Sequence, residues 1–193
     1  MACRADERLN EHGFSITEVL VVVAVTGILS AMAVPITRGF IRSSTADSSV
    51  VQLQAAIDMA HDRAVAERRN FILTLTPPRT IQISRQEIDG AGTVTGTTLV
   101  ETYGLENNQQ FLRFAGMADT PDAFGGAAAI NFTGTLPVTF TSDGSLIDAN
   151  GDVVNGSIFI GTPNEPMSAR AVTVFGVTGL MRTWNWRGSK WME

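Results

Sequence analysis

An uninterrupted apolar block forms the first part of the chain. No charged residue lies between Val19 and Val34, and valine, leucine, isoleucine and alanine make up most of this stretch. The hydrocarbon core of a bilayer is crossed by about 20 predominantly apolar residues in a helix. The pattern therefore predicts a membrane-spanning helix over residues 14–36.

A helical period continues after this block. Apolar residues recur at alternating intervals of three and four positions: Val50, Leu53, Ile57, Ala60 and Ala64. Such spacing places them on one face of an amphipathic helix, and no glycine or proline interrupts residues 40–69. We expect this second helical part over residues 37–70, with a kink at Pro35, because proline removes one backbone hydrogen bond of a helix.

Short strand-like runs replace the helical period from Phe71 onward. Residues 71–76 and 80–84 flank Pro77-Pro78-Arg79, which is typical of a hairpin. Further candidate strands are residues 97–103, 110–114, 128–132, 138–141, 157–161, 171–177 and 180–186, and residues 115–127 form a loop by composition. We therefore predict an α+β fold, in which one long helix packs on a mainly antiparallel β-sheet domain of residues 71–193.

Composition narrows the range of functions. The chain has 14 basic and 19 acidic residues, a net charge of −5 that argues against nucleic-acid binding driven by overall charge. Residues 14–193 contain one histidine, His61, and no cysteine, since Cys3 lies earlier. The sequence contains no G-x-S-x-G, H-E-x-x-H or glycine-rich phosphate-binding motif. We therefore expect neither an enzyme nor a cofactor or metal site.

One acidic segment has the spacing with which a calcium-binding loop begins: Asp148, Asn150 and Asp152. An EF-hand loop also needs glycine at its sixth position and glutamate at its twelfth. Those positions hold Val153 and Phe159. The segment is therefore predicted to be a tight polar turn between strands.

Glu18 is a carboxylate just inside the apolar block. A charge at bilayer depth costs on the order of 3 kcal/mol and usually has a functional partner. The nearest cations in sequence, Arg8 and Arg38, lie too far along a helix to reach it. Cleavage after Gly13 would supply a partner, because the new amine of Phe14 would lie about one turn away or face the Glu18 of a neighbouring subunit.

The segment Gly13-Phe14-Ser15-Ile16-Thr17-Glu18, followed by an apolar helix, resembles the processing site of type IV pilins and type II secretion pseudopilins. The resemblance implies that a prepilin peptidase removes residues 1–13 as a leader, that Phe14 is N-methylated and that Glu18 contacts the next subunit. Pro35 stands where pilins commonly carry a kinking proline. The resemblance also implies a single-pass protein of the bacterial inner membrane with its globular domain in the periplasm.

The rest of the chain resembles H-type pseudopilins and FimT-type minor pilins, the GspH/FimT family, in residues 55–70, 138–144 and 174–182. This predicts a minor pseudopilin, a structural subunit near the tip of a type II secretion pseudopilus that supports protein export. The alternative is a minor type IV pilin for pilus biogenesis or DNA uptake. The implied partners are other pilins or pseudopilins, the prepilin peptidase and the inner-membrane assembly platform.

A basic and aromatic cluster lies near the C-terminus. If residues 180–187 form a strand, Arg182, Trp184 and Trp186 share one face, with Arg187 next along the chain. Such a surface could bind single-stranded nucleic acid by stacking and phosphate contact, or it could pack on the domain, which we favour. Some DNA-binding relatives carry a Gly-Arg-x-Arg pattern, whereas Gly179-Leu180-Met181-Arg182 lacks the first arginine, so nucleic-acid binding is disfavoured.

Overall fold

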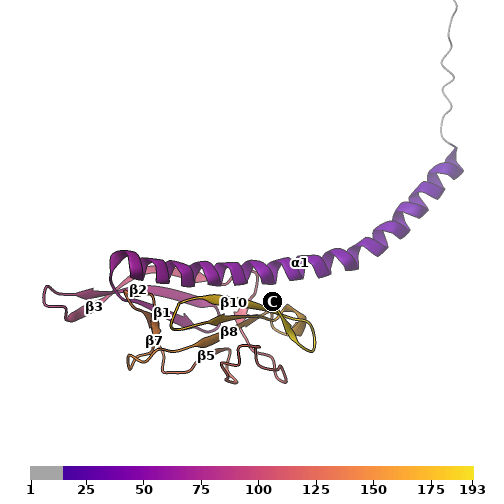
Figure 1. Ribbon diagram of the computed structural model, residues 1–193. Helices are drawn as coiled ribbons and strands as arrows, with labels where there is room; N and C mark the ends of the chain where they lie inside the picture. The colour runs from indigo at the N-terminus through magenta and orange to yellow at the C-terminus, as the bar shows by residue number, and fades with distance from the viewer. Residues whose placement is uncertain (1–14) are drawn as a thin grey trace, which may run out of the picture. The chain divides into compact units, whose positions relative to one another are not determined.

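One long helix precedes a β-rich region in the structure, a computed structural model that describes residues 15–193 and gives only the backbone for residues 33–43 (Figure 1). The helix is α1 (Ile16–Glu67). Its backbone stays helical through Pro35, so the two predicted helical parts form one element. The chain divides into two compact units, Met1–Ile41 and Arg42–Glu193, and α1 contributes residues to both.

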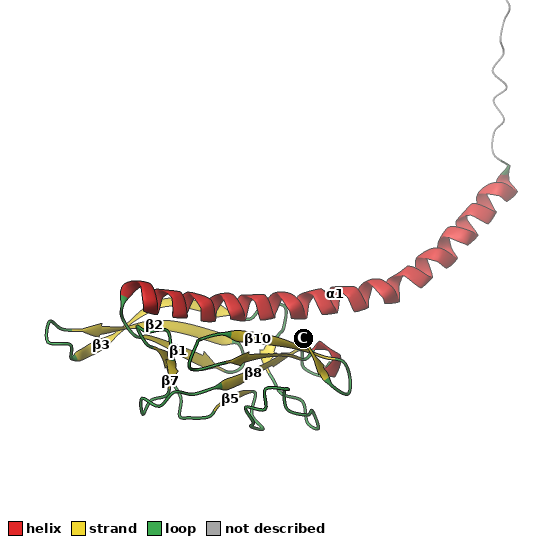
Figure 2. Ribbon diagram, in the orientation of Figure 1, coloured by secondary structure: helices red, strands yellow, loops and turns green. Residues whose placement is uncertain are grey.

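The strands form two antiparallel sheets, shown in yellow in Figure 2. The first sheet has the order β3-β2-β1-β6-β7 and contains β1 (Phe71–Thr76), β2 (Thr80–Ile88), β3 (Val94–Gly104), β6 (Val138–Phe140) and β7 (Leu146–Ile147). The second has the order β11-β10-β9-β8-β4, with β5 paired to β8. It contains β4 (Gln110–Phe111), β5 (Ile130–Phe132), β8 (Gly156–Gly161), β9 (Arg170–Val174), β10 (Met181–Trp186) and β11 (Trp191–Met192). A 3₁₀ turn, η1 (Pro166–Ser168), precedes β9.

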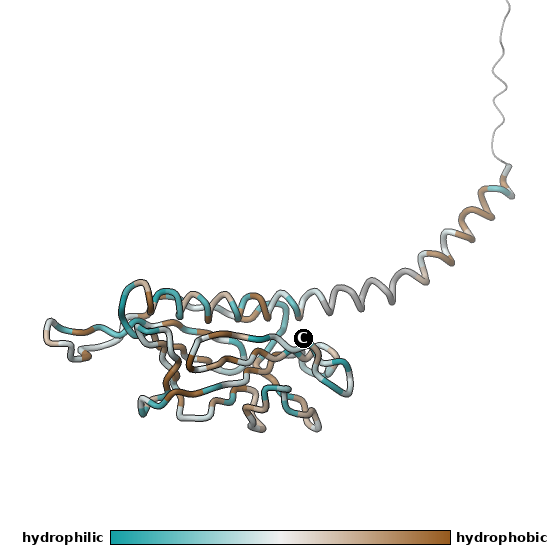
Figure 3. The backbone as a smooth tube through the Cα atoms, viewed as in Figure 1, coloured by the Kyte–Doolittle hydropathy of each residue, from teal (hydrophilic) through white to brown (hydrophobic). Residues whose placement is uncertain are grey.

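The main hydrophobic core lies between the second part of α1 and the two sheets. The predicted stripe is buried in full: Val50 is 6 % exposed, and Leu53, Ile57, Ala60 and Ala64 are 0 % exposed. These residues pack with side chains from both sheets: Phe71, Leu73, Ile81, Ile83, Phe140, Ile158, Ile160, Val172 and Val174. Burying one leucine or isoleucine side chain contributes about 1.5–3 kcal/mol, so the stripe holds α1 on the sheets. Figure 3 shows apolar and polar residues alternating along this part of the helix.

A second hydrophobic cluster lies on the opposite face of the second sheet. Alternation along β8 sends Ile158 and Ile160 to the main core and Phe159 to this cluster. Its members are Met117, Phe159, Ala169, Ala171, Trp184, Trp186 and Trp191, with Phe114 packed against them. The sheet is therefore buried on both faces, by α1 on one side and by the chain around residues 112–127 on the other.

The predicted hairpin is confirmed, because β1 and β2 pair antiparallel from Phe71 opposite Arg85 to Thr76 opposite Thr80. Two predicted strands extend furthest beyond their observed C-terminal ends: residues 110–114 are a strand only to Phe111, and residues 171–177 only to Val174. The second ends early because a turn begins there, closed by the Gly179 N–H donating to the Phe175 carbonyl at 2.8 Å. The strands β7 and β11, of two residues each, were not predicted.

The strand β3 lies at the edge of the first sheet and pairs irregularly with β2. The register shifts between Ile83 and Ser84 and again between Glu87 and Ile88. Each shift leaves an extra residue on β3, Val100 at the first and Thr95 at the second, as in a β-bulge.

Candidate functional site

The first predicted site lies at the start of α1. Gly13 and Phe14, the predicted cleavage and methylation residues, lie outside the described part of the chain. Ser15 caps the helix: the Glu18 N–H donates to the Ser15 carbonyl at 3.0 Å and approaches its Oγ at 3.3 Å. Glu18 lies in the first helical turn, where a negative charge interacts favourably with the helix dipole. Its carboxylate has no hydrogen bond or ion pair to any residue that the structure describes.

The apolar segment that follows Glu18 presents its side chains outward. Each large apolar residue described between Ile16 and Met32 is at least 48 % exposed. Its hydroxyl groups are satisfied within the helix, because Thr26 Oγ1 donates to the Val22 carbonyl at 2.8 Å and Ser30 Oγ to the Thr26 carbonyl at 2.7 Å. Such back-bonding lets polar side chains sit in an apolar environment. Within the described residues, no helix is both long enough and apolar enough to cross a membrane.

Pro35 lies inside α1, as the sequence predicted, but its side chain is outside the described part. The kink assigned to it stays a prediction.

The C-terminal cluster is held together by a chain of hydrogen bonds. Trp184 Nε1 donates to Thr173 Oγ1 at 3.0 Å, and the Thr173 hydroxyl donates to Asp122 Oδ2 at 2.6 Å. The other oxygen of Asp122 accepts from Arg182 Nη1 at 2.9 Å. The Arg182 guanidinium also lies over the ring of Phe175, 5.2 Å from its centroid. The network ties β9 and β10 to the loop of residues 115–127.

The three tryptophans are buried rather than displayed. Trp184 and Trp186 are each 8 % exposed and Trp191 is 7 % exposed. Trp186 and Trp191 meet edge to face at 5.1 Å, and Trp191 Nε1 donates to the Ala118 carbonyl at 2.9 Å. Their ring faces are therefore engaged inside the domain, as the packing interpretation predicted. Of the four residues considered for nucleic-acid contact, Arg182 is half exposed but paired with Asp122, and Arg187 lies exposed in the turn before β11.

Sequence reasoning missed the two residues that organise this cluster. Thr173 is 0 % exposed and lies on β9. The Asp122 side chain is only 7 % exposed, although it belongs to a segment that composition marks as a loop. No local signal in the sequence links these positions, because they are 51 residues apart.

The acidic segment after β7 forms a polar turn, as predicted. Asp148 Oδ1 accepts the N–H groups of Asn150 and Asp152 at 2.8 and 3.1 Å, and Oδ2 accepts the Thr135 N–H at 3.0 Å. These bonds, chiefly the one from Thr135, lower the pKa of Asp148 to about 2. Among the described residues, no group of three or more potential ligands could hold a metal ion.

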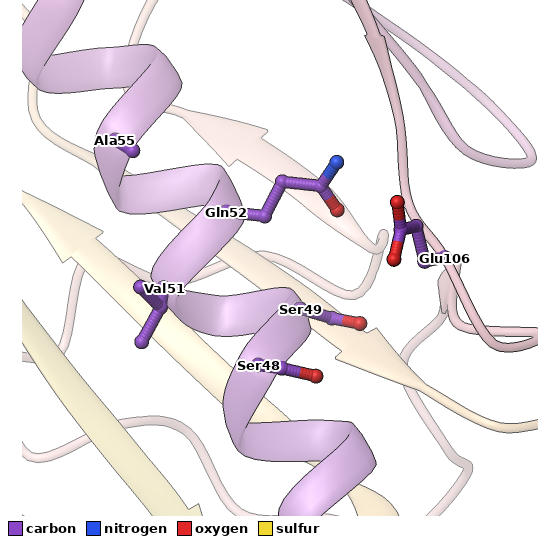
Figure 4. Close-up of a pocket in the computed structure, with 6 residues that line it drawn as sticks. All are labelled: Ser48, Ser49, Val51, Gln52, Ala55 and Glu106. Atoms are coloured by element: carbon purple, nitrogen blue, oxygen red, sulfur yellow. The ribbon is translucent and has the colours of Figure 1, made fainter.

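A shallow groove runs beside α1 (Figure 4). It is lined by Ser48, Ser49, Val51, Gln52, Ala55 and Glu106. Gln52 Nε2 donates to the Gly104 carbonyl at 3.0 Å, which fixes the end of β3 to the helix. The groove combines hydroxyl groups with one carboxylate and has no nucleophile paired with a base, so we assign it no chemistry.

Comparisons with known proteins found one matching family and two similar solved structures. Residues 8–34 match the family described as the prokaryotic N-terminal methylation motif. No curated protein sequence matches the chain. The solved structure of the minor pseudopilin EpsH from the type 2 secretion system of Vibrio cholerae is similar to this chain with a TM-score of 0.48 and 12 % sequence identity. The match covers 72 % of this chain and 96 % of the EpsH chain. The type IV minor pilin FimU of Pseudomonas aeruginosa is 14 % identical, with a TM-score of 0.48 over 80 % of this chain and 97 % of that one.

The matched motif covers Gly13, Phe14, Glu18 and most of the apolar segment. It stands at the head of a long helix that packs on antiparallel sheets. The chain therefore carries a prokaryotic N-terminal methylation motif at the head of this helix.

Proposed function

We propose that the protein is a minor pseudopilin, a structural subunit near the tip of a type II secretion pseudopilus that supports protein export across the outer membrane. The observation that carries the proposal is the match of residues 8–34 to the N-terminal methylation motif. The alternative is a minor type IV pilin for pilus biogenesis or DNA uptake, which would use the same N-terminal chemistry.

In this proposal a prepilin peptidase cuts between Gly13 and Phe14, and the new N-terminal amine of Phe14 is methylated. Glu18 then becomes the fifth residue of the mature chain. When subunits assemble, Glu18 pairs with the N-terminal amine of a neighbouring subunit and sets the depth at which each helix enters the filament. The lack of a partner for Glu18 among the described residues supports a contact made only on assembly.

Before assembly the protein waits in the bacterial inner membrane as a single-pass protein, with residues 71–193 in the periplasm. The exposed apolar side chains between Ile16 and Met32 support this location, because they need either lipid or neighbouring helices to cover them. The partners are other pilin-like subunits, the prepilin peptidase and the inner-membrane assembly platform.

N-terminal processing provides the direct test. Co-expression with a prepilin peptidase should shorten the chain by the 13 residues of the leader, and mass spectrometry of the N-terminus should find methylated Phe14. Gly13→Asp should block cleavage. Gly90→Asp is the matched control, because Gly90 lies in an exposed turn and no other atom lies within 4 Å of the position that a Cβ would take there. Recovery of an intact Met1 start in assembled material would contradict the proposal.

Deletion of the gene distinguishes a role in a secretion pseudopilus from a role in a type IV pilus. A pseudopilin deletion should abolish export of secreted enzymes and leave piliation intact. Loss of pili or of DNA uptake with normal export would instead favour the alternative.

A further inference from the structure

The segment between β7 and β8 contains two asparagines that are each followed by glycine, Asn150-Gly151 and Asn155-Gly156. In such a pair the backbone nitrogen of the glycine can attack the side-chain carbonyl carbon of the asparagine. Glycine favours this attack because it has no Cβ to hinder the approach and its backbone reaches conformations that other residues avoid. The structure places the two pairs in very different surroundings.

The first pair lies in an exposed turn. Residues 149–153 are all exposed. Gly151 has a φ of +91°, and no atom beyond its chain neighbours lies within 4 Å of the position that a Cβ would take there. Asn150 and Gly151 can therefore change conformation without displacing a packed side chain.

The hydrogen bonds that restrain the first pair belong to the same surface turn. Asn150 Nδ2 donates to Asp148 Oδ2 at 3.1 Å and to Thr135 Oγ1 at 3.2 Å. The Gly151 N–H donates to the Asp148 carbonyl at 3.1 Å. These bonds must break before the attack, but water can replace them as the turn opens. Such local opening of an exposed segment costs less free energy than global unfolding.

The second pair is held inside the fold. Asn155 Oδ1 accepts the Gly176 N–H at 2.8 Å. Gly156 is buried on β8, where it lies opposite Phe132 of β5 on one side and Val174 of β9 on the other. A Cβ on Gly156 would lie 2.3 Å from the Phe132 ring. The second pair can therefore reach a reactive conformation only when these strands separate, which breaks up the second sheet.

We propose that Asn150 is a site of spontaneous deamidation in the folded protein and that the fold protects Asn155. The Gly151 nitrogen forms a bond to Asn150 Cγ and gives up its proton, and the Cγ–Nδ2 bond breaks as ammonia leaves. Water then opens the resulting cyclic imide at either carbonyl, which converts the asparagine to aspartate or isoaspartate. Water is the co-reactant, and nothing is oxidised or reduced.

Deamidation changes the charge of the turn. It adds a carboxylate next to Asp148, whose lowered pKa of about 2 keeps it ionised at neutral pH. It also removes the amide that donates to Asp148 Oδ2 and Thr135 Oγ1. A repulsion between like charges then replaces a hydrogen bond. The modification therefore accumulates with the age of each molecule and loosens the contact between residues 133–135 and 148–152.

Incubation of residues 42–193 at mildly alkaline pH tests this proposal. The fragment contains both hydrophobic clusters in full, so it folds without the apolar segment. Trypsin cuts after Arg113 and Arg170 and leaves both pairs in one peptide, so fragmentation mass spectrometry compares them in the same molecules. Asn150 should gain the mass change of an amide converted to an acid at least about tenfold faster than Asn155.

The same incubation in urea is the matched control. Unfolding removes the protection of Asn155, so the two rates should then agree within about threefold. Equal rates at Asn150 and Asn155 in the folded fragment would overturn the proposal, because the fold would then make no difference. An Asn150 that stays unmodified in the folded fragment, while the unfolded chain reacts, would also overturn it.

Discussion

Thr173 joins the C-terminal strands to the loop of residues 115–127 through two hydrogen bonds of its hydroxyl group. The Thr173→Val variant measures how much these bonds contribute to the free energy of unfolding. The Thr173 hydroxyl accepts from Trp184 Nε1 and donates to Asp122 Oδ2. Valine has nearly the shape of threonine but neither donates nor accepts a hydrogen bond. The substitution therefore leaves two buried partners without that bond while creating almost no cavity.

The expected cost follows from the burial of those partners. Trp184 is 8 % exposed and the Asp122 side chain is 7 % exposed, so water cannot readily replace the lost bonds. A buried polar group left unsatisfied costs about 1–3 kcal/mol, and Asp122 keeps its bond to Arg182. We expect Thr173→Val to lower the free energy of unfolding by roughly 3 kcal/mol. Thr173→Ser keeps the hydroxyl and removes one methyl group, which costs about 1 kcal/mol.

Urea unfolding of residues 42–193, followed by circular dichroism, gives both values. Adding Trp184→Phe to Thr173→Val removes the N–H that the first substitution orphans. The double variant should therefore lose about 1 kcal/mol less than the sum of the single variants. If the valine and serine variants agree within about 0.5 kcal/mol, the hydroxyl contributes no net stability and the reasoning is refuted.

Three further predictions concern charged residues. The fragment of residues 42–193 should bind short DNA weakly or not at all at physiological salt, because its tryptophans are buried; sub-micromolar, salt-sensitive binding that is lost in Arg182→Ala would contradict this. Glu18→Val should leave membrane insertion and cleavage normal but impair filament function, since the buried amine of a neighbour loses its counter-charge, at a cost of roughly 3–5 kcal/mol. Fractionation, N-terminal sequencing and export assays measure each step, and normal function would mean that Glu18 makes no such contact or that this subunit caps the filament. The lowered pKa of Asp148, about 2 instead of 3.8, contributes stability that is fully present above about pH 4 and is lost as the pH falls toward 2. Asp148→Asn should weaken this dependence in acid-unfolding curves, because it keeps an acceptor for the turn without the charge; an unchanged curve would argue against it.

Periodicity was enough to predict the elements whose burial is regular. The stripe from Val50 to Ala64 is buried at the predicted positions, and the β1–β2 hairpin turns at the predicted prolines. The strands β7 and β11 were missed because two residues carry no period. The end of β9 was misplaced because Phe175 and Val177 continue the apolar run while the backbone turns at Gly179.

The candidate sites, too, were predictable from the sequence only where a pattern along the chain determines them. A pattern along β10 predicted that Arg182, Trp184 and Trp186 share one face. It did not reveal what covers them, because the cover comes from Met117, Ala118 and Asp122 in a loop remote in sequence. Gly13 and Phe14 were assigned from the motif alone; they lie within the matched residues 8–34 but outside the described part of the chain, so their roles stay predictions.

The irregular pairing of β3 has a consequence for solubility. An edge strand of eleven residues with one charged residue, Glu101, is a template onto which strands of other molecules can add. The extra residues Thr95 and Val100 break the even spacing of the outward backbone groups and increase the local twist. An incoming strand therefore cannot stay in register along the edge, which protects the domain from edge-to-edge aggregation when many copies are crowded together.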